Sequence, residues 1–141
     1  MDHASTVRDE VRAHGRELRR AIPEVYRGYA QLRTAALAPG ALDVRIKELI
    51  ALAIAVTREC DGCIASHAEG AARAGATEAE VAEALGVAVL MNGGPATVYG
   101  PRAFAAFREF VAATGPLEQP EGLQDAAHAA DQRIHGKGIR P

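Results

Sequence analysis

The apolar residues of this chain recur with the period of an α-helix over most of its length. A first amphipathic helix is predicted over residues 5–20, weakened by a glycine in its middle. Its apolar positions are Val7, Val11, Leu18 and Ile22. Pro23 suits the first turn of a second helix, whose apolar face holds Val25, Tyr29, Leu32 and Ala36. Asp43 is a good N-cap for a third helix that runs to about Arg58. Because this third helix is apolar on nearly every side, we expect it at the centre of the fold.

The second half of the chain continues the helical pattern. A fourth helix is predicted to begin near Cys60 and to end at Gly75, a suitable C′ glycine. Thr77 and Glu80 form a capping box for a fifth helix, with its inward face at Val81, Leu85, Ala88 and Val89. The segment 92–95, Asn-Gly-Gly-Pro, ends that helix.

A last main helix carries a stripe of aromatic and apolar residues. Its members are Tyr99, Ala103, Phe104, Phe107, Phe110 and Val111. Pro101 either kinks this helix or marks its start. From Gly115 onward, prolines and glycines are frequent and apolar residues are few, which predicts a loosely ordered tail with one short helix near 121–133.

Composition agrees with an all-α fold. The chain has 141 residues, 4% aromatic residues, no tryptophan and abundant alanine, which favours closely packed helices over a β-sandwich. We expect an all-α, single-domain bundle of about six helices. Its parts are an N-terminal helix (1–22), a core (23–114) and the tail (115–141).

Charge and hydropathy limit the partners. The formal net charge is −2 and the pI is about 6.2, so no basic surface indicates nucleic acid. The longest apolar run, residues 49–56, is far shorter than the ~20 residues of a membrane span. The polar N-terminus lacks the apolar segment of a secretory signal. We therefore expect a cytoplasmic protein without nucleic-acid or membrane partners.

The reactive residues gather in one segment, ELIALAIAVTRECDGCIASH. Cys60, Cys63 and His67 are spaced i, i+3, i+7 and so share one stripe of a helix. Two thiols that can close a disulfide beside a titratable base are the parts of a redox site, and the start of a helix lowers a thiol pKa. His67 lies one turn beyond Cys63, where it can take up the thiol proton. Glu48 would orient the imidazole, but in one unbroken helix it would lie ~18 Å from Cys60. The relay therefore requires a bend near residues 58–60 and a fourth helix that folds back along the third.

Other interpretations of this segment remain open. The two cysteines could be incidental buried thiols. A zinc site made by Cys60, Cys63, His67 and Glu48 is chemically reasonable, although a second CxxC or HxxxH half is missing. Glu59 is best interpreted as a solvated charge at a helix end. No nucleotide-binding or metalloprotease motif occurs, so we expect no cofactor and no metal.

With these residues in place, the chain resembles the alkylhydroperoxidase D-like branch of the carboxymuconolactone decarboxylase superfamily, from Pro23 to Phe110. The resemblance rests on KELIALAIAV, CDGCIASH and MNGGPATVYGPRAFAAF. It implies an all-helical fold, homotrimers or homohexamers, and thiol-dependent reduction of a small-molecule peroxide. By this analogy Cys63 is the peroxidatic thiol, Cys60 resolves the sulfenic acid as a disulfide, and Glu48 with His67 relays protons. A dithiol reductant, a lipoyl or thioredoxin-like protein, would restore the thiols.

The match to that branch has one departure, and other functions remain open. Alkylhydroperoxidase D members carry a histidine just before the second cysteine, where this chain has Gly62. The helix terminus alone would make Cys60 the more acidic thiol.

One alternative is a carboxymuconolactone decarboxylase-like enzyme acting on a small lactone acid, which would not need the cysteine pair. Another is a non-enzymatic thiol redox sensor. Alanine-rich apolar faces on the fifth and sixth helices predict a homo-oligomer in each case.

Overall fold

The computed structural model describes residues 3–114, and all the regular secondary structure of that part is α-helical. The helices are α1 (His3–Ala21), α2 (Pro23–Leu37), α3 (Val44–Thr57), α4 (Asp61–Arg73), α5 (Glu78–Asn92) and α6 (Gly94–Thr114). The predicted all-α bundle of six helices is confirmed. The predicted tail and its short helix lie outside the described residues. None of the described helices is long and apolar enough to cross a membrane.

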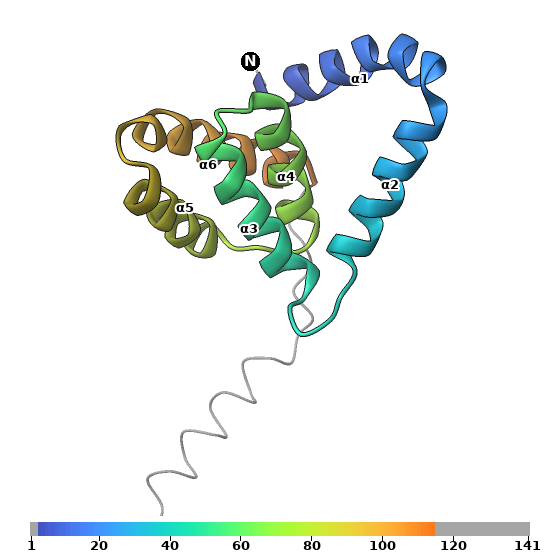
Figure 1. Ribbon diagram of the computed structural model, residues 1–141. Helices are drawn as coiled ribbons and strands as arrows, with labels where there is room; N and C mark the ends of the chain where they lie inside the picture. Colours follow the sequence, from blue (N-terminus) through green and yellow to red (C-terminus); the bar gives the residue numbers. More distant parts are fainter. Residues whose placement is uncertain (1–2, 115–141) are drawn as a thin grey trace, which may run out of the picture.

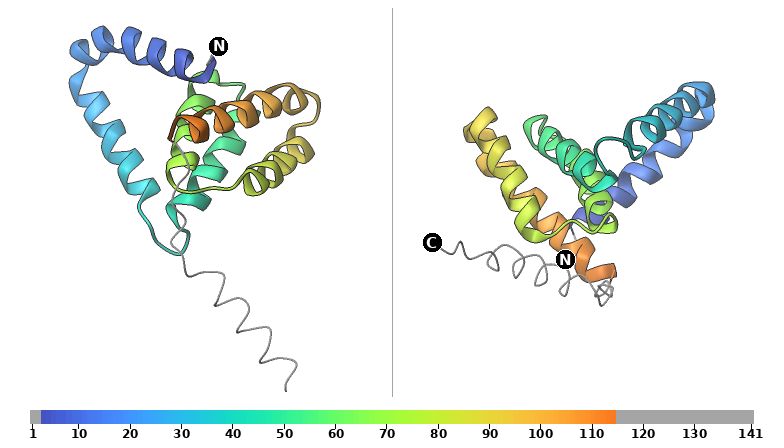
Figure 2. Two further views of the ribbon diagram at one scale, coloured as in Figure 1. Left: turned by 180° about the vertical axis from the view of Figure 1, so that it is seen from behind. Right: turned by 90° about the horizontal axis from the view of Figure 1, so that it is seen from below.

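Helices α3 to α6 pack together as the body of the molecule, and α1 and α2 form an arm beside it (Figure 1). Helix α1 starts against α4 and α6 and leads away, and α2 returns toward the start of α3, as a view from behind also shows (Figure 2). The core of the body is centred on four fully buried side chains: Leu52, Val56, Val81 and Phe107. Buried alanines from α3, α4, α5 and α6 surround them. Small side chains let helix backbones approach closely, which explains how a chain poor in aromatic residues closes a core.

The helix boundaries follow the capping residues of the sequence. The Asp43 carboxylate accepts a hydrogen bond from the backbone N–H of Ile46 at 2.8 Å, and α3 starts there. Thr77 and Glu80 form the predicted capping box of α5. Gly75, just beyond α4, has a φ of 78°, the left-handed conformation that glycine adopts without strain. These local signals were sufficient because each hydrogen bond joins residues close in sequence.

Two expectations about the helix faces need correction, and one of the two alternatives for Pro101 is excluded. Val89 was expected to point inward on α5 but is 38% exposed. On the central helix α3, Leu52 and Val56 are buried, whereas Ile50 and Ile54 are exposed. Pro101 does not mark the start of the last helix, because α6 begins at Gly94 and Pro101 lies inside it. A single-chain pattern shows which residues are apolar, but it does not show which apolar face another helix covers.

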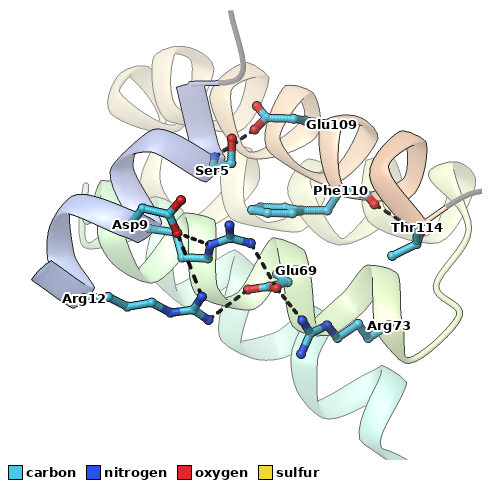
Figure 3. A network of polar contacts seen from close by, with 9 residues as sticks. Ser5, Asp9, Arg12, Glu69, Arg73, Glu109, Phe110 and Thr114 are labelled. Carbon is cyan, nitrogen blue, oxygen red and sulfur yellow. Dashed lines mark hydrogen bonds and ion pairs between the residues drawn. The ribbon is translucent and has the colours of Figure 1, made fainter.

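The arm formed by α1 and α2 is joined to the body at α1, where Ala4 and Val7 pack against the core and polar contacts add to the attachment. The backbone N–H groups of Ala4 and Ser5 donate to the Glu109 carboxylate of α6, at 3.1 and 2.8 Å. Further along α1, Arg8 and Arg12 form ion pairs with Glu69 of α4, at 3.1 and 3.5 Å (Figure 3). No residue of α2 is buried. The predicted second helix therefore forms, but this chain alone leaves its apolar face uncovered.

Candidate functional site

A carboxylate and an imidazole meet between α3 and α4. Oε2 of Glu48 lies 2.7 Å from Nδ1 of His67. Glu48 is only 4% exposed, whereas the side chain of His67 keeps 22% of its surface. A buried carboxylate needs a partner, and the imidazole supplies one. The carboxylate in turn fixes the orientation of the ring and stabilises its charged form.

The reversal of the chain between α3 and α4 brings these two residues together. Helix α3 ends at Thr57, and Glu59 then takes a φ of 54°. The backbone N–H of Cys60 donates to the carbonyl of Ala55, and α4 begins at Asp61. Helix α4 therefore packs against α3, as the predicted relay requires. Glu59 itself is exposed, in agreement with its interpretation as a solvated charge.

The space that holds the Glu48 carboxylate depends on Gly70. A Cβ atom added at Gly70 would lie 2.5 Å from both Cδ and Oε1 of Glu48 and 2.7 Å from Oε2. Any larger residue would therefore displace the carboxylate. The sequence analysis did not identify this residue. The available signal was a glycine one turn beyond His67, in a helix interior where glycine is unfavourable.

The two sulfur atoms of the CxxC pair are joined. Cys60 and Cys63 form a disulfide with their Cα atoms 5.2 Å apart. Cys60 is the N-cap of α4, and its Sγ accepts a hydrogen bond from the backbone N–H of Cys63 at 3.2 Å. Cys63 is exposed and Cys60 only partly so. The more exposed of the two cysteine residues therefore lies one turn before His67 on the same helix.

Gly62, between the two cysteines, lies beneath α1. A Cβ atom at this position would approach a side-chain methyl of Val11 to 3.2 Å. Val11 of α1 therefore fills part of the space that a side chain at position 62, such as the histidine of alkylhydroperoxidase D members, would need. Because residue 62 is glycine, it supplies no polar group to the site.

Helix α2 contributes a residue that the sequence analysis did not identify. Arg33 places Nη2 3.9 Å from Oε1 of Glu48, and its Nη1 donates to Oγ of Ser66 at 3.3 Å. The guanidinium thus lies beside the Glu48–His67 pair and adds positive charge to it. Nothing in the local sequence distinguished Arg33 from the other arginines of the arm, because its contacts are made across 15 and 33 residues.

The disulfide and His67 open onto one cleft of about 840 Å³. Its floor is the start of α4 with Cys60, Cys63 and His67, and its walls come from α1 and α2. Of the four residues in the predicted site, three line this cleft, and Glu48 lies behind His67. The four residues were predicted together, and the structure brings them together.

The arrangement of ligand atoms bears on the zinc interpretation. Within residues 3–114, no group of three or more His, Cys, Asp or Glu side chains is arranged to hold a metal ion. The two sulfur atoms bond to each other rather than presenting two thiolates. While this disulfide is closed, the two sulfur atoms do not act as separate thiolate ligands.

Fold and site together define a class of protein: an all-α bundle in which a buried Glu–His pair stands behind a CxxC disulfide. The chain belongs to the carboxymuconolactone decarboxylase family, whose model matches residues 23–109. That match begins at the first residue of α2 and ends within α6. It contains all four residues of the predicted site.

Similar proteins support this membership. An uncharacterized protein of Cupriavidus necator is 38% identical over 90 residues, which cover 64% of this chain and 80% of that protein. A Paracoccus denitrificans protein, described as uncharacterized protein 4 in the cox locus, is 39% identical over 93 residues. Those residues cover 66% of this chain and 84% of the relative.

Two solved structures share the fold. A carboxymuconolactone decarboxylase family protein from Legionella pneumophila, crystallised in its apo form, superposes with a TM-score of 0.76 at 40% identity. That match covers 79% of this chain and 99% of the Legionella chain. TM1620 from Thermotoga maritima has a TM-score of 0.58 at 24% identity, over 89% of this chain and 99% of its own, and shows the fold alone.

Proposed function

We propose that this protein is a thiol-dependent peroxidase that reduces organic hydroperoxides through Cys60 and Cys63. The observation that carries the proposal is the 2.7 Å contact between Glu48 and His67 behind a disulfide that opens onto a cleft. Family membership supports an enzyme of this superfamily. The disulfide favours redox chemistry over lactone decarboxylation, which does not use a cysteine pair.

The reaction starts from the reduced dithiol. His67 accepts the proton of Cys63, and the thiolate attacks one oxygen of the hydroperoxide O–O bond. The bond breaks, Cys63 becomes a sulfenic acid, and the departing alkoxide takes a proton from His67 to leave as an alcohol. The Cys60 thiol then attacks the Cys63 sulfur, water leaves, and the disulfide forms.

A second substrate completes the cycle. A dithiol reductant attacks the disulfide, passes through a mixed disulfide and leaves oxidised, while Cys60 and Cys63 regain their protons. The net reaction converts one hydroperoxide and one dithiol into an alcohol, water and the oxidised reductant. We assign the attacking role to Cys63 because it is the more exposed of the two cysteine residues and stands one turn from His67.

The test is a peroxide-consumption assay with several dithiol donors on the wild type and two variants. Cys63→Ser is expected to abolish turnover, because no thiolate remains next to His67. Cys60→Ser, treated with one equivalent of peroxide in the absence of a dithiol, is expected to leave a sulfenic acid on Cys63 that mass spectrometry detects. Full activity of Cys63→Ser would overturn the assignment. One stoichiometric oxidation of the wild type without turnover would favour a redox sensor.

A further inference from the structure

The charge of the cleft over the disulfide is one-sided. Three arginines line it, Arg19 from α1 with Arg27 and Arg33 from α2, and within residues 3–114 no aspartate or glutamate does. For a chain with a formal net charge of −2, this is a local concentration of positive charge. A concave surface with one sign of charge attracts ligands of the opposite sign.

Two of the three arginines already have partners. Nη1 of Arg27 lies 2.6 Å from a carboxylate oxygen of Glu24 on the same helix. Arg33 donates to Ser66 and lies near Glu48. Arg19 differs, because in residues 3–114 it has no carboxylate within ion-pair distance. Its guanidinium lies 5.2 Å from the ring centre of Tyr26.

The contact with Tyr26 gives Arg19 a defined place in the cleft. A guanidinium over an aromatic ring keeps its edge N–H groups free for a bidentate acceptor. This contact also connects the two helices of the arm, because Arg19 belongs to the last turn of α1 and Tyr26 to the first turn of α2. An anion that binds here would therefore meet a donor that is already oriented.

The rest of the cleft is mainly apolar. Val11, Pro23 and Ala30 contribute aliphatic surface, and Tyr26 and Tyr29 contribute rings. Val11 and Tyr29 are more than half exposed in this chain. Apolar walls with few polar groups are typical of sites for small organic ligands, in which the polar groups fix the orientation.

We propose that this cleft binds an organic anion: a molecule with one carboxylate, held by Arg19, and an apolar body against α1 and α2. This inference rests on the proposed peroxidase function. If that function holds, the substrate is an organic hydroperoxide that bears a carboxylate and whose O–O group reaches Cys63. Arg19 then determines specificity and takes no part in bond breaking.

The first test compares two substrates that differ by one carboxylate, cumene hydroperoxide and 4-carboxycumene hydroperoxide. Turnover is measured with dithiothreitol, a neutral dithiol that does not compete for the arginines. We expect the wild type to show a higher kcat/KM for the carboxylated compound. Arg19→Gln is expected to lower the ratio of the two kcat/KM values about tenfold, mainly through KM. Arg16→Gln is the matched control, since Arg16 is exposed on the same helix and does not line the cleft. It should leave the ratio unchanged.

The second test measures binding without turnover. The oxidised protein is titrated calorimetrically with 4-isopropylbenzoate and with its neutral analogue, 4-isopropylbenzyl alcohol. We expect the benzoate to bind more tightly, with an affinity that falls as salt rises and falls in Arg19→Gln. Charge-selective binding without turnover of either hydroperoxide would support the cleft assignment and overturn the peroxidase. Equal turnover of both hydroperoxides, with no preference for the benzoate, would overturn the cleft assignment and leave the peroxidase standing.

Discussion

At the scale of single residues, the site depends on one buried carboxylate. Glu48 is 4% exposed, with Nδ1 of His67 at 2.7 Å and Nη2 of Arg33 at 3.9 Å from its carboxylate oxygens. A carboxylate in this position orients the imidazole through Nδ1, so that the other ring nitrogen is the one available for proton transfer. The charge of Glu48, and not only its shape, is therefore expected to matter.

Replacing Glu48 by glutamine tests that charge. Glu48→Gln keeps the size of the side chain but no longer stabilises a protonated His67. We expect peroxide reduction at neutral pH to fall about 10- to 100-fold, with the melting temperature maintained. The measurement is kcat/KM across pH 5.5–8.5 together with thermal unfolding. A pH–rate profile identical to that of the wild type would remove Glu48 from the relay.

A second residue-scale prediction concerns Gly70. Gly70→Ala would place a methyl group 2.5 Å from the Glu48 carboxylate, so the carboxylate or α4 must move. We expect the free energy of unfolding to fall by about 1–3 kcal/mol and the peroxidase rate to fall with it. Chemical denaturation and the peroxide assay measure the two effects.

Gly86→Ala is the matched control for this substitution. Gly86 also lies inside a helix, but a Cβ there would meet nothing within 4 Å. Alanine is the better helix former, so we expect Gly86→Ala to be neutral or stabilising by up to about 1 kcal/mol. Equal effects of the two substitutions would show that the contact with Glu48 is unimportant.

At the scale of helices, the attachment of α1 decides whether the cleft exists. In the first turn of α1, the backbone N–H groups of Ala4 and Ser5 donate to the carboxylate of Glu109 on α6. Burial raises the pKa of Glu109, but the hydrogen bonds from Ser5 and from the backbone of Ala4 lower it more. The net pKa lies below the ordinary value. The carboxylate form is thus the one that holds α1 (Figure 3).

The pH dependence of this attachment has a definite sign. Because folding lowers the pKa of Glu109, its stabilising contribution is present above the pKa of the unfolded chain, about 4.3. This stabilising contribution is lost as the pH falls through the lower pKa that Glu109 has in the folded protein. We expect Glu109→Gln to unfold more easily than the wild type at pH 7, by about 1 kcal/mol. Urea denaturation at several pH values should show this difference shrinking below about pH 4. A difference that is constant down to pH 3 would contradict the ionic attachment.

At the scale of the whole molecule, large apolar side chains remain uncovered. Val25 and Leu32 on α2 are 64% and 65% exposed, and Leu90 and Met91 at the end of α5 are 80% and 77% exposed. Apolar surface of this extent is typical of subunit interfaces. We infer that the protein assembles with copies of itself, as a trimer or hexamer.

Light scattering coupled to size exclusion tests the assembly. We expect the mass of three or six chains for the wild type. Leu90→Glu places a charge on the most exposed of these side chains and is expected to reduce the mass. Glu83→Gln, a change at an exposed position of the same helix, is the control and should leave the mass unchanged. A monomeric wild type would contradict the inference.

Local patterns along the chain were sufficient to predict the helices and to identify the reactive groups. The Asp43 cap, the Thr77–Glu80 capping box and the glycine after α4 fixed helix ends because their hydrogen bonds and backbone angles are local. The spacing of Cys60, Cys63 and His67 likewise predicted that they share one stripe, because residues three or four apart lie on the same side of a helix.

The way in which those helices meet became clear only from their packing in three dimensions. It places Arg33 beside Glu48, Gly70 beneath the carboxylate, and Arg19 over the cleft. It also shows that Val89 and Ile54 are exposed rather than buried. None of these relations follows from local spacing, because each depends on how two helices separated by a turn or a long segment pack against each other. Packing is decided by the sum of many weak contacts over the whole bundle, and no short stretch of sequence contains that sum.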